Sequence, residues 1–185
     1  MRLLICAGGT GGGVYPALAV FQALNAKRSD VETLWIGGEG GMEAELVKRE
    51  GIPFATIPAA GLHGVGLRAL PRNMAQLGRG LLASQKILRE FKPDVLFFTG
   101  GFVAGPMAIA GRTIPTLLYV PDIEPGLALK SLARFANRIT VTVEDSKKYF
   151  KQKVLVTGYP LRADLAAWDK AKGRAALALD ENIPV

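Results

Sequence analysis

The sequence predicts a Rossmann-like α/β fold, a doubly wound parallel sheet of six or seven strands. Two observations carry this prediction. Short apolar segments that favour β-structure alternate with segments whose apolar residues recur at helical spacing, which is typical of strands joined by helical crossovers. Glycine-rich stretches follow two of the apolar segments, as happens where a parallel strand turns into a helix. We expect residues 1–185 to form a single domain.

Each expected strand is short, rich in apolar and β-favouring residues, and bounded by Gly, Pro or Asp. The strands are expected at residues 2–7, 32–37, 54–58, 94–99, 115–120, 138–143 and 153–158. Helices are expected between them, from Ala17 to Leu24 and over residues 41–51, 67–91 and 126–137. In the helix at 67–91, Pro71, Gly78 and Gly80 favour a broken or loop-started helix over one rigid rod.

The composition indicates a folded protein with an anionic partner. The chain is 49% hydrophobic, and 23 Lys and Arg against 16 Asp and Glu leave a formal charge of +7. Nucleic acid, an anionic membrane surface or a phosphorylated substrate would suit that charge. No apolar run reads as a membrane-spanning helix, and we expect no signal peptide after Arg2. The lone Cys6 is expected in the core and fits a cytoplasmic protein without an internal disulfide.

The stretch "GGTGGGVYP", residues 8–16, follows the first expected strand and is interpreted as a strand-to-helix loop, with Pro16 in the first helical turn. Its glycines let an anion or sugar approach main-chain N–H groups, and the helix start adds partial positive charge. The dinucleotide fingerprint is absent because Thr10 and Val14 stand where glycines are required, and Val14 also replaces the P-loop lysine. The alternative is a tight turn whose glycines only fit helix against strand.

Three further predicted loops also contain Gly and Pro residues directly after a strand. "FFTGGFVAGPMAIAG" (97–111) repeats the strand, glycine pair and helix, and "VPDIEPG" (120–126) and "TGYPLR" (157–162) follow two later strands. The carboxyl ends of parallel strands lie at one edge of a sheet, where open α/β sheets bind ligands. We therefore expect all four loops to line one cleft.

Four motifs in this order carry a family resemblance: "GGTGG" (8–12), "GGFVAGP" (100–106), "EPGLALKSLA" (124–133) and "GYPLR" (158–162). Together they resemble the N-terminal domain of the MurG-like peptidoglycan N-acetylglucosaminyltransferases, family 28 of the two-domain (GT-B) glycosyltransferases. The resemblance implies transfer of a sugar from a UDP-sugar donor to a lipid-linked diphosphate acceptor, with no metal and no cofactor. It also implies that a C-terminal UDP-sugar-binding domain is absent from this chain, which alone is expected to be inactive.

The resemblance also implies which residues bind substrate. The first loop brings its glycines and one threonine to the donor, the second loop lies beside it, and an arginine follows at the domain junction. The implied binding residues are Thr10, Gly11, Gly12, Gly13, Gly100, Gly101, Phe102, Asp122 and Arg162. This chain departs from the family at Gly13, where histidine is usual, and over residues 119–122, where Tyr-Val-Pro-Asp replaces the usual His-Glu-Gln-Asn.

Asp122 is the best candidate for the catalytic base. A sugar hydroxyl that attacks a nucleotide sugar needs a proton acceptor. Asp122, at the position where the resemblance implies Asn, is the best local carboxylate, followed by Glu124. Either side chain could instead cap the helix that starts near Pro125. His63 is the only histidine, so it cannot form a metal site with other histidines.

Two other functions stay open. Glu39, Glu43 and Glu45 follow the second strand, where dinucleotide enzymes keep a ribose-binding acid, although Glu43 and Glu45 also suit the N-terminal half of a helix. A nucleotide-binding domain of another enzyme would therefore share this topology. A non-enzymatic membrane-binding module would share the charge, whereas nucleic-acid binding has no recognition motif behind it.

The 67–91 helix is expected to dock on the anionic, cytoplasmic face of the membrane. One apolar stripe runs along it, with basic residues alongside and no acid before Glu90. The alternative is a stripe that packs on the sheet beside a solvated basic face. The expected docking residues are Arg68, Arg72, Met74, Leu77, Arg79 and Leu81.

Overall fold

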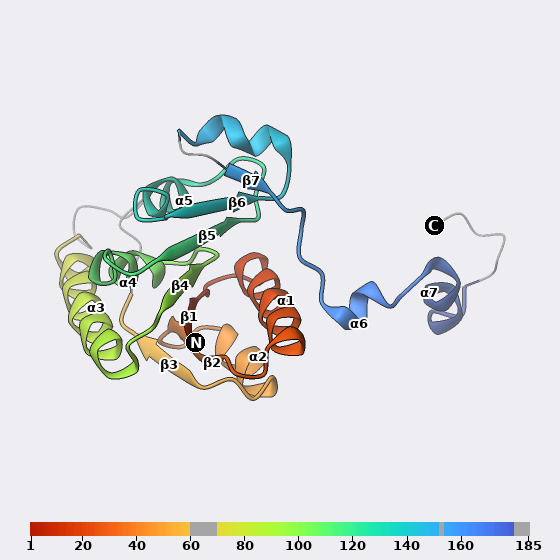
Figure 1. Cartoon of the computed structure of the whole chain (residues 1–185), viewed down its shortest axis with the longest axis horizontal. Helices are drawn as coiled ribbons and strands as arrows, with labels where there is room; N and C mark the ends of the chain where they lie inside the picture. The colour runs from red at the N-terminus through yellow and green to blue at the C-terminus, as the bar shows by residue number, and fades with distance from the viewer. Residues whose placement is uncertain (60–69, 152–153, 180–185) are drawn as a thin grey trace.

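Seven parallel strands form one sheet, in the order β3-β2-β1-β4-β5-β6-β7, in the computed structural model, which describes residues 1–59, 70–151 and 154–179 (Figure 1). Every pair of neighbouring strands is parallel, so the predicted doubly wound sheet is confirmed. All the predicted strands are present: β1 (Arg2–Cys6), β2 (Glu32–Gly38), β3 (Phe54–Ile57), β4 (Val95–Phe98), β5 (Thr116–Val120), β6 (Arg138–Val141) and β7 (Val154–Val156).

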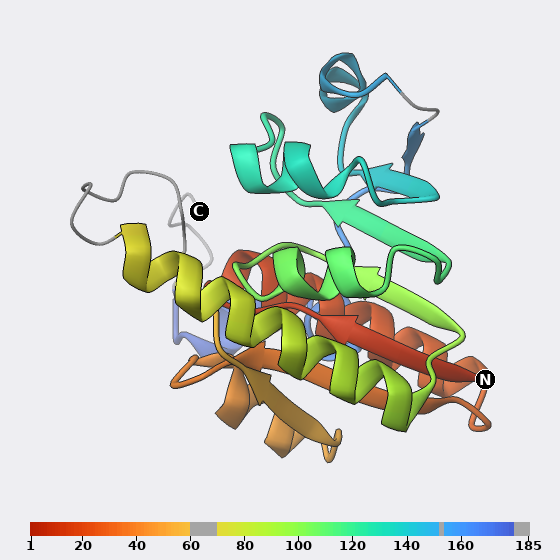
Figure 2. The same cartoon turned by 90° about the vertical axis from the view of Figure 1, so that its left-hand side faces the viewer.

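Helices cover both faces of the sheet (Figure 1, Figure 2). One face carries α1 (Gly11–Lys27) and α2 (Glu43–Arg49), and the other carries α3 (Leu70–Phe91), α4 (Ala104–Ala110) and α5 (Leu127–Leu132). A 3-10 helix, η1 (Glu144–Tyr149), leads from β6 towards β7. After β7 the chain continues into α6 (Ala163–Ala166) and α7 (Lys170–Ala176).

Side chains of the central strands alternate between two apolar layers. In β1, Leu3 and Ile5 pack in the layer of α1 and α2, whereas Leu4 and Cys6 pack in the layer of α3, α4 and α5. A strand covered on both faces requires this pattern, because successive side chains point to opposite sides. Cys6 is buried as expected, and burial raises the pKa of its thiol.

The first glycine loop is shorter than the sequence predicts. α1 already begins at Gly11, and the N–H groups of Gly13 and Val14 donate to the Thr10 carbonyl, both at 3.3 Å. The loop is therefore limited to Gly8, Gly9 and Thr10, and the prediction of a loop over residues 8–16 was wrong. Pro16 lies inside the helix, one turn beyond the predicted position.

α3 is one continuous helix of 22 residues, so the broken-helix alternative was wrong (Figure 2). The loop-started alternative concerns residues 67–69, which lie outside the described residues. Pro71 stands in the first turn, where proline is tolerated because its missing N–H has no intrahelical partner. Gly80 serves packing instead of bending, since a Cβ there would collide with the Pro58 carbonyl oxygen. The glycine lets the helix lie close to the end of β3.

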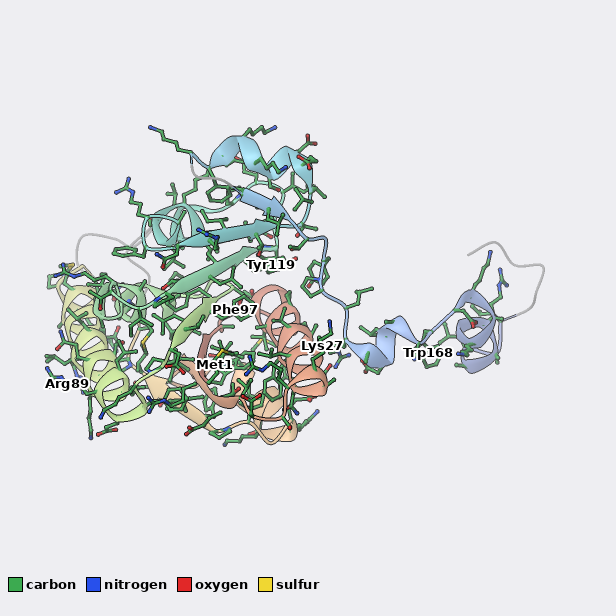
Figure 3. All side chains as sticks on the ribbon, viewed as in Figure 1. Met1, Lys27, Arg89, Phe97, Tyr119 and Trp168 are labelled. Carbon is green, nitrogen blue, oxygen red and sulfur yellow. The ribbon has the colours of Figure 1, made fainter. Side chains whose placement is uncertain are left out.

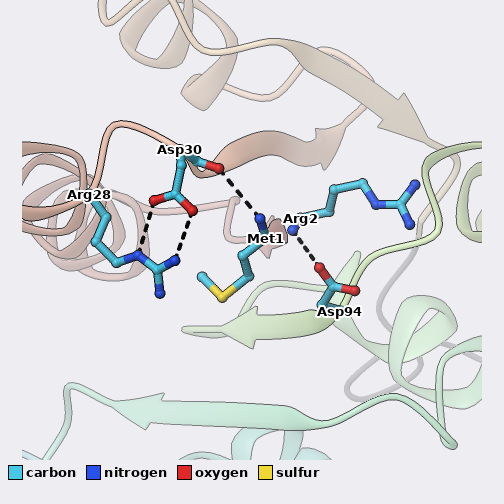
Figure 4. A network of polar contacts seen from close by, with 5 residues as sticks. All are labelled: Met1, Arg2, Arg28, Asp30 and Asp94. Atoms are coloured by element: carbon cyan, nitrogen blue, oxygen red, sulfur yellow. Dashed lines mark hydrogen bonds and ion pairs between the residues drawn. The ribbon is translucent and has the colours of Figure 1, made fainter.

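Polar contacts fasten the amino ends of three strands, at the edge opposite the glycine loops (Figure 4). The Arg2 backbone N–H donates to Asp94 Oδ2 at 2.7 Å, which joins the start of β1 to the start of β4. The N-terminal amine of Met1 donates to the Asp30 carbonyl, and the Asp30 carboxylate pairs with Arg28 at 2.8 Å. These contacts are exposed.

The segment after β7 leads away from the sheet towards α6 and α7 (Figure 1). Figure 3 contrasts Phe97 and Tyr119, which lie within the body of strands and helices, with Trp168 on the outlying segment. Trp168 is 55% exposed, whereas Tyr119 is 2% exposed. The described core is therefore built by the sheet and the helices up to β7, and membership of α6 and α7 in the same domain stays a prediction.

Candidate functional site

The two glycine loops meet at the centre of the sheet's carboxyl edge. β1 and β4 are neighbours, and the strand order runs outward from them in opposite directions, which makes this pair the topological switch point. Because every strand is parallel, the loops after β1, β4, β5 and β7 lie at the same edge, as predicted. A Cβ on Gly101 would approach the Gly8 carbonyl oxygen to 2.6 Å, so the two loops are in backbone contact.

Three side chains from neighbouring elements hold the first loop and the start of α1. Trp35 of β2 donates from its indole N–H to the Ala7 carbonyl at 2.8 Å. The Gly9 backbone N–H donates to Glu43 Oε2 at 3.3 Å, and Thr99 Oγ1 donates to the Gly13 carbonyl at 2.8 Å. The loop is therefore fixed by partners far away in the sequence.

A cleft of about 240 Å³ opens beside the two loops. Five of its eleven lining residues are glycines, and the lining comes from the first loop, the turn after β2, the second loop, Ala59 and the helices α2 and α3. Phe102 is 60% exposed at its side and presents an apolar face of the kind on which sugar rings and lipid groups pack. The lining residues are Gly8, Gly9, Gly38, Glu39, Gly40, Gly41, Glu43, Ala59, Gln76, Phe102 and Val103.

The implied binding residues of the two loops differ in accessibility. Thr10 and Gly12 are exposed, and Gly11 is half-buried. Gly13 is buried, and a Cβ there would lie 3.3 Å from Thr99 Oγ1, so a side chain at this position, where the resemblance implies histidine, would require Thr99 to shift. Gly11 and Gly12, by contrast, lie in the first turn of α1, where backbone N–H groups have no intrahelical partner and can donate to a ligand.

In the second loop, Gly100 and Gly101 have φ angles of 122° and 87°, which residues other than glycine rarely adopt. Gly100 is buried and Gly101 is half-buried. The glycine pair therefore turns the chain sharply after β4 and carries it past the first loop to the exposed Phe102.

Arg162 reaches from the last loop to α1. Its guanidinium lies 5.2 Å from the Tyr15 ring centroid and pairs with Asp164 at 3.5 Å, and Nε has no hydrogen-bond partner among the described residues. A second cleft of about 220 Å³ is lined by Tyr15, Tyr159, Pro160, Leu161, Arg162 and Leu165. The structure thus places Arg162 beside the helix that follows the first loop, with its Nε–H group available to donate a hydrogen bond.

Asp122 and Tyr119 occupy the segment where this chain departs from the family. The Asp122 side chain is exposed and has no hydrogen-bond partner among the described residues. Tyr119 is buried, and its hydroxyl lies 2.9 Å from Thr142 Oγ1 and donates to the Gly158 carbonyl at 3.3 Å. Burial raises the pKa of the Tyr119 phenol. Asp122 is thus free to act at the edge, whereas Tyr119 supports the loop at Gly158.

The capping alternative for Asp122 and Glu124 is not what the structure shows. α5 begins after Gly126, which serves as N-cap, and no side chain caps it. Glu124 lies 3.9 Å from Lys130, as an exposed ion pair. Two carboxylates therefore stand at the carboxyl edge without a capping role.

The sequence predicted the position of Glu43 at a helix start but not the contacts of its side chain. We expect it from the sequence to favour a helix start, and it is the first residue of α2, yet its side chain turns back towards the loops and is fully buried. The signal that could have found it is the glycine content around it: Cβ atoms on Gly8, Gly37 or Gly41 would collide with its carboxylate.

α3 carries the expected docking residues that the structure describes. Arg72 and Arg79 are exposed, Met74 is 53% exposed, and Leu77 and Leu81 are half-buried. The side towards the core instead includes the buried Gly80 and Ser84 and the partly buried Ile87, Leu88 and Phe91. Arg68 and His63 lie outside the described residues.

Two kinds of feature are missing from residues 1–59, 70–151 and 154–179. No group of three or more His, Cys, Asp or Glu side chains there could hold a metal ion. Nor is any helix in those ranges long and apolar enough to cross a membrane.

Residues 3–141 match the glycosyltransferase family 28 N-terminal domain. The chain belongs to this family. The matched range includes both glycine loops, the cleft beside them and the segment around Asp122. Family membership, which the sequence motifs predicted, is thereby confirmed.

Individual relatives support the same family. The chain is 38% identical over 189 residues to the UDP-N-acetylglucosamine--N-acetylmuramyl-(pentapeptide) pyrophosphoryl-undecaprenol N-acetylglucosamine transferase of Desulforudis audaxviator, covering 98% of this chain and 50% of that protein. It is 40% identical over 169 residues to the protein of the same name in Desulforamulus reducens, covering 89% and 45%. The chain therefore spans about half the length of these relatives.

Solved structures show the same fold. Acinetobacter baumannii MurG matches with a TM-score of 0.71 and 28% identity, covering 85% of this chain and 44% of that one. UDP-GlcNAc 2-epimerase from Neisseria meningitidis matches with a TM-score of 0.64 at 15% identity, over 86% of this chain and 47% of that one, which is a likeness of fold alone. The predicted N-terminal half of a GT-B fold is thereby confirmed.

Proposed function

We propose that this chain is the acceptor-side half of a glycosyltransferase that moves N-acetylglucosamine from UDP-N-acetylglucosamine to a lipid-linked N-acetylmuramyl-pentapeptide diphosphate. The observation that carries the proposal is the pair of glycine loops in contact at the switch point, within the range that matches the family. The substrates are those named for relatives at 38% and 40% identity. The family resemblance implies that a separate C-terminal domain binds most of the UDP-sugar, and this chain spans about half the length of these relatives.

The reaction needs a nucleophile, a base and a stabilised leaving group. An acceptor hydroxyl attacks the anomeric carbon of the donor, the bond from that carbon to the diphosphate oxygen breaks, and UDP leaves with the electron pair. The free amides of Gly11 and Gly12 and the positive end of α1 stabilise negative charge on the diphosphate. Arg162, beside the same helix, adds a positive charge.

The exposed Asp122 carboxylate accepts the proton of the attacking hydroxyl. Its freedom from other hydrogen bonds among the described residues leaves both oxygens available for that role. General-base catalysis typically accelerates a reaction by about a hundredfold to ten-thousandfold, and we expect a contribution in that range from Asp122.

The test uses this chain joined to a family C-terminal domain, with labelled UDP-N-acetylglucosamine and the lipid-linked acceptor. We expect transfer by the joined protein, none by residues 1–185 alone, and about a hundredfold or greater loss in Asp122→Asn. Glu124→Gln is the matched control, because Glu124 is a neighbouring exposed carboxylate paired with Lys130. Equal activity of the Asp122 and Glu124 variants would exclude Asp122 as the base.

The same proposal includes docking on an anionic membrane surface, where the lipid acceptor resides. α3 runs along one side of the molecule (Figure 2). Its Arg72, Arg79 and Met74 are exposed. Basic residues near an anionic leaflet each contribute about 1 kcal/mol, and an apolar side chain adds to that by insertion. Such docking would be peripheral, at the cytoplasmic face.

Vesicle co-sedimentation tests the docking. The chain is expected to sediment with vesicles containing anionic lipid at low salt and to remain in solution with neutral vesicles or at high salt. Arg72→Glu with Arg79→Glu should reduce binding, whereas Arg49→Glu with Arg138→Glu makes the same charge change on α2 and β6 and should reduce it less. Equal loss in both pairs would show that net charge, and not α3, determines binding.

A further inference from the structure

We infer that Glu43 is a positioning residue: its buried carboxylate joins the first glycine loop to the end of β2 and thereby fixes where the loop presents its backbone to substrate. One oxygen, Oε2, accepts the Gly9 N–H at 3.3 Å, and the other, Oε1, accepts the Gly38 N–H at 2.8 Å. Gly9 and Gly38 follow neighbouring strands, so one side chain connects two loops of the carboxyl edge. The functional part of this inference rests on the proposed transferase activity.

The surroundings of Glu43 are shaped around its carboxylate. The residue is fully buried, at 0% exposure, although it opens α2 at the protein's edge. Cβ atoms on Gly8 and Gly41 would collide with the carboxylate, and one on Gly37 would lie 2.7 Å from Oε1. A carboxylate is costly to bury unless it is hydrogen-bonded, and here each oxygen accepts a backbone N–H.

The loop depends on this contact because a glycine backbone has little conformational preference of its own. Gly9 has a φ of 86°, so nothing in ordinary backbone preference holds it in place. The Gly9 N–H would be left without its partner if the carboxylate were removed, and a partly buried N–H without a partner favours rearrangement. Gly8 carries the contact with Gly101, so a shift of the first loop reaches the second.

Glu43 lines the cleft beside both loops without offering itself to a ligand. Both oxygens are engaged and the residue is inaccessible to solvent. It therefore acts through Gly9 and Gly38 and is not a catalytic residue. The effect on the reaction comes from geometry, because a displacement of about 1 Å in a positioned group can reduce a rate by about a hundredfold.

Backbone NMR of residues 1–185 tests the positioning directly. Glu43→Gln keeps the size of the side chain but leaves one acceptor oxygen, so it can retain the shorter bond to Gly38 and must lose the longer bond to Gly9. We expect the Gly9 amide resonance to shift and its hydrogen exchange to accelerate about tenfold. Unchanged Gly9 and Gly38 amides in this variant would overturn the inference.

Two control variants separate positioning from stability. Glu45→Gln makes the same chemical change at an exposed site of α2 and should leave the Gly9 amide as it is. Val47→Ala removes buried apolar volume from the same helix, so it lowers stability without touching the loop contacts, and the Gly9 chemical shift should stay unchanged. If Glu43→Gln does not fold, Glu43→Asp retains the charge, shortens the reach by one methylene group and is expected to release Gly9.

Activity of the chain joined to a family C-terminal domain provides the second measurement. Glu43→Gln is expected to lower kcat about tenfold or more with little change in the KM for UDP-N-acetylglucosamine, and Glu45→Gln is expected to match the wild type. An active wild type with equal kcat in both variants would refute the functional role of Glu43. An inactive wild type would refute the proposed transferase function instead, and the NMR result would still decide whether Glu43 positions the loop.

Discussion

The two glycine loops are held in place by different means. The first loop, Gly8 to Thr10, is bounded by contacts from side chains of other elements, namely Trp35, Glu43 and Thr99. The second loop is fixed by its own backbone, through the positive φ angles of Gly100 and Gly101 and the contact of Gly101 with Gly8. A glycine can therefore be required for two reasons: to adopt a conformation, or to leave room for a distant side chain.

This difference determines how each loop responds to mutation. Substitution in the second loop acts where it is made, because the backbone itself is forced out of its conformation. Substitution at Gly8 of the first loop acts through the Glu43 side chain that occupies the space, so removal of that side chain should restore tolerance. The variants below separate these two behaviours, beginning with the largest expected effect.

Gly101→Ala should cause the largest loss of stability. Alanine at a φ of 87° is strained, and its Cβ would lie 2.6 Å from the Gly8 carbonyl oxygen, which is backbone and cannot rotate away. We expect the free energy of unfolding to fall by about 3 kcal/mol, measured by denaturant titration. Gly105→Ala in α4 is the control, since its Cβ meets nothing within 4 Å, and it should be neutral or slightly stabilising. Equal losses in the two variants would contradict the assignment of strain to the second loop.

Gly8→Ala should be costly only while Glu43 is present. The added Cβ collides with the Glu43 carboxylate, and we expect a loss of about 2 kcal/mol in the unfolding free energy. In a Glu43→Ala background the space is empty, so the same substitution should cost less by about 1–2 kcal/mol in a double-mutant cycle. Additive effects would mean that Gly8 is needed for its backbone and not for the carboxylate, which would remove the distinction between the loops.

Tyr119→Phe tests whether the loop at Gly158 is also held by a side chain. Loss of the contacts to Thr142 and Gly158 should cost about 1 kcal/mol near neutral pH. Burial raises the pKa of the phenol above its ordinary value of 10.0, so the folded state favours the neutral form. That stability is fully present below pH 10 and is lost as the pH rises through the folded-state pKa. The wild type should therefore approach Tyr119→Phe in stability at alkaline pH, and a constant difference up to pH 12 would contradict this origin.

The sequence allowed the fold to be predicted almost completely, because the signals were local. Every strand was predicted from its apolar composition and from the Gly, Pro or Asp residues that bound it. Because the strands are parallel, the four loops that follow them lie at one edge of the sheet. The errors were also local: the glycines from Gly11 onward begin a helix, and Gly80 packs on Pro58 without bending α3. Glycine content alone does not distinguish a loop from a close approach.

The site was less predictable, because its parts come together only in three dimensions. Glu43 lies 34 residues after Gly9, and at that separation a helix-start role accounts for its position equally well. Tyr119 stands where the family resemblance implies a polar group, yet it is buried in the layer of α1 and α2, and its hydroxyl supports Gly158. Motif matching shows which position has changed, and only packing shows what the new side chain does.

The contacts at the amino edge of the sheet should contribute least to stability, and they provide the reference for the effects of the loop variants. Asp30 pairs with Arg28 in an exposed turn, and the hydrogen bond from Arg28 lowers the Asp30 pKa below its ordinary value of 3.8 (Figure 4). A lowered carboxyl pKa stabilises the fold above about pH 4, and the contribution is lost as the pH falls through the folded-state value. Asp30→Asn should therefore reduce thermal stability slightly at pH 7, less so in high salt, and not at all near pH 2. Glu32→Gln, which removes one negative charge from a neighbouring exposed acid with no side-chain hydrogen bond among the described residues, is the control at pH 7. An Asp30 effect as large as that of Gly8→Ala would show that the contacts at the amino edge hold the sheet as firmly as those around the loops.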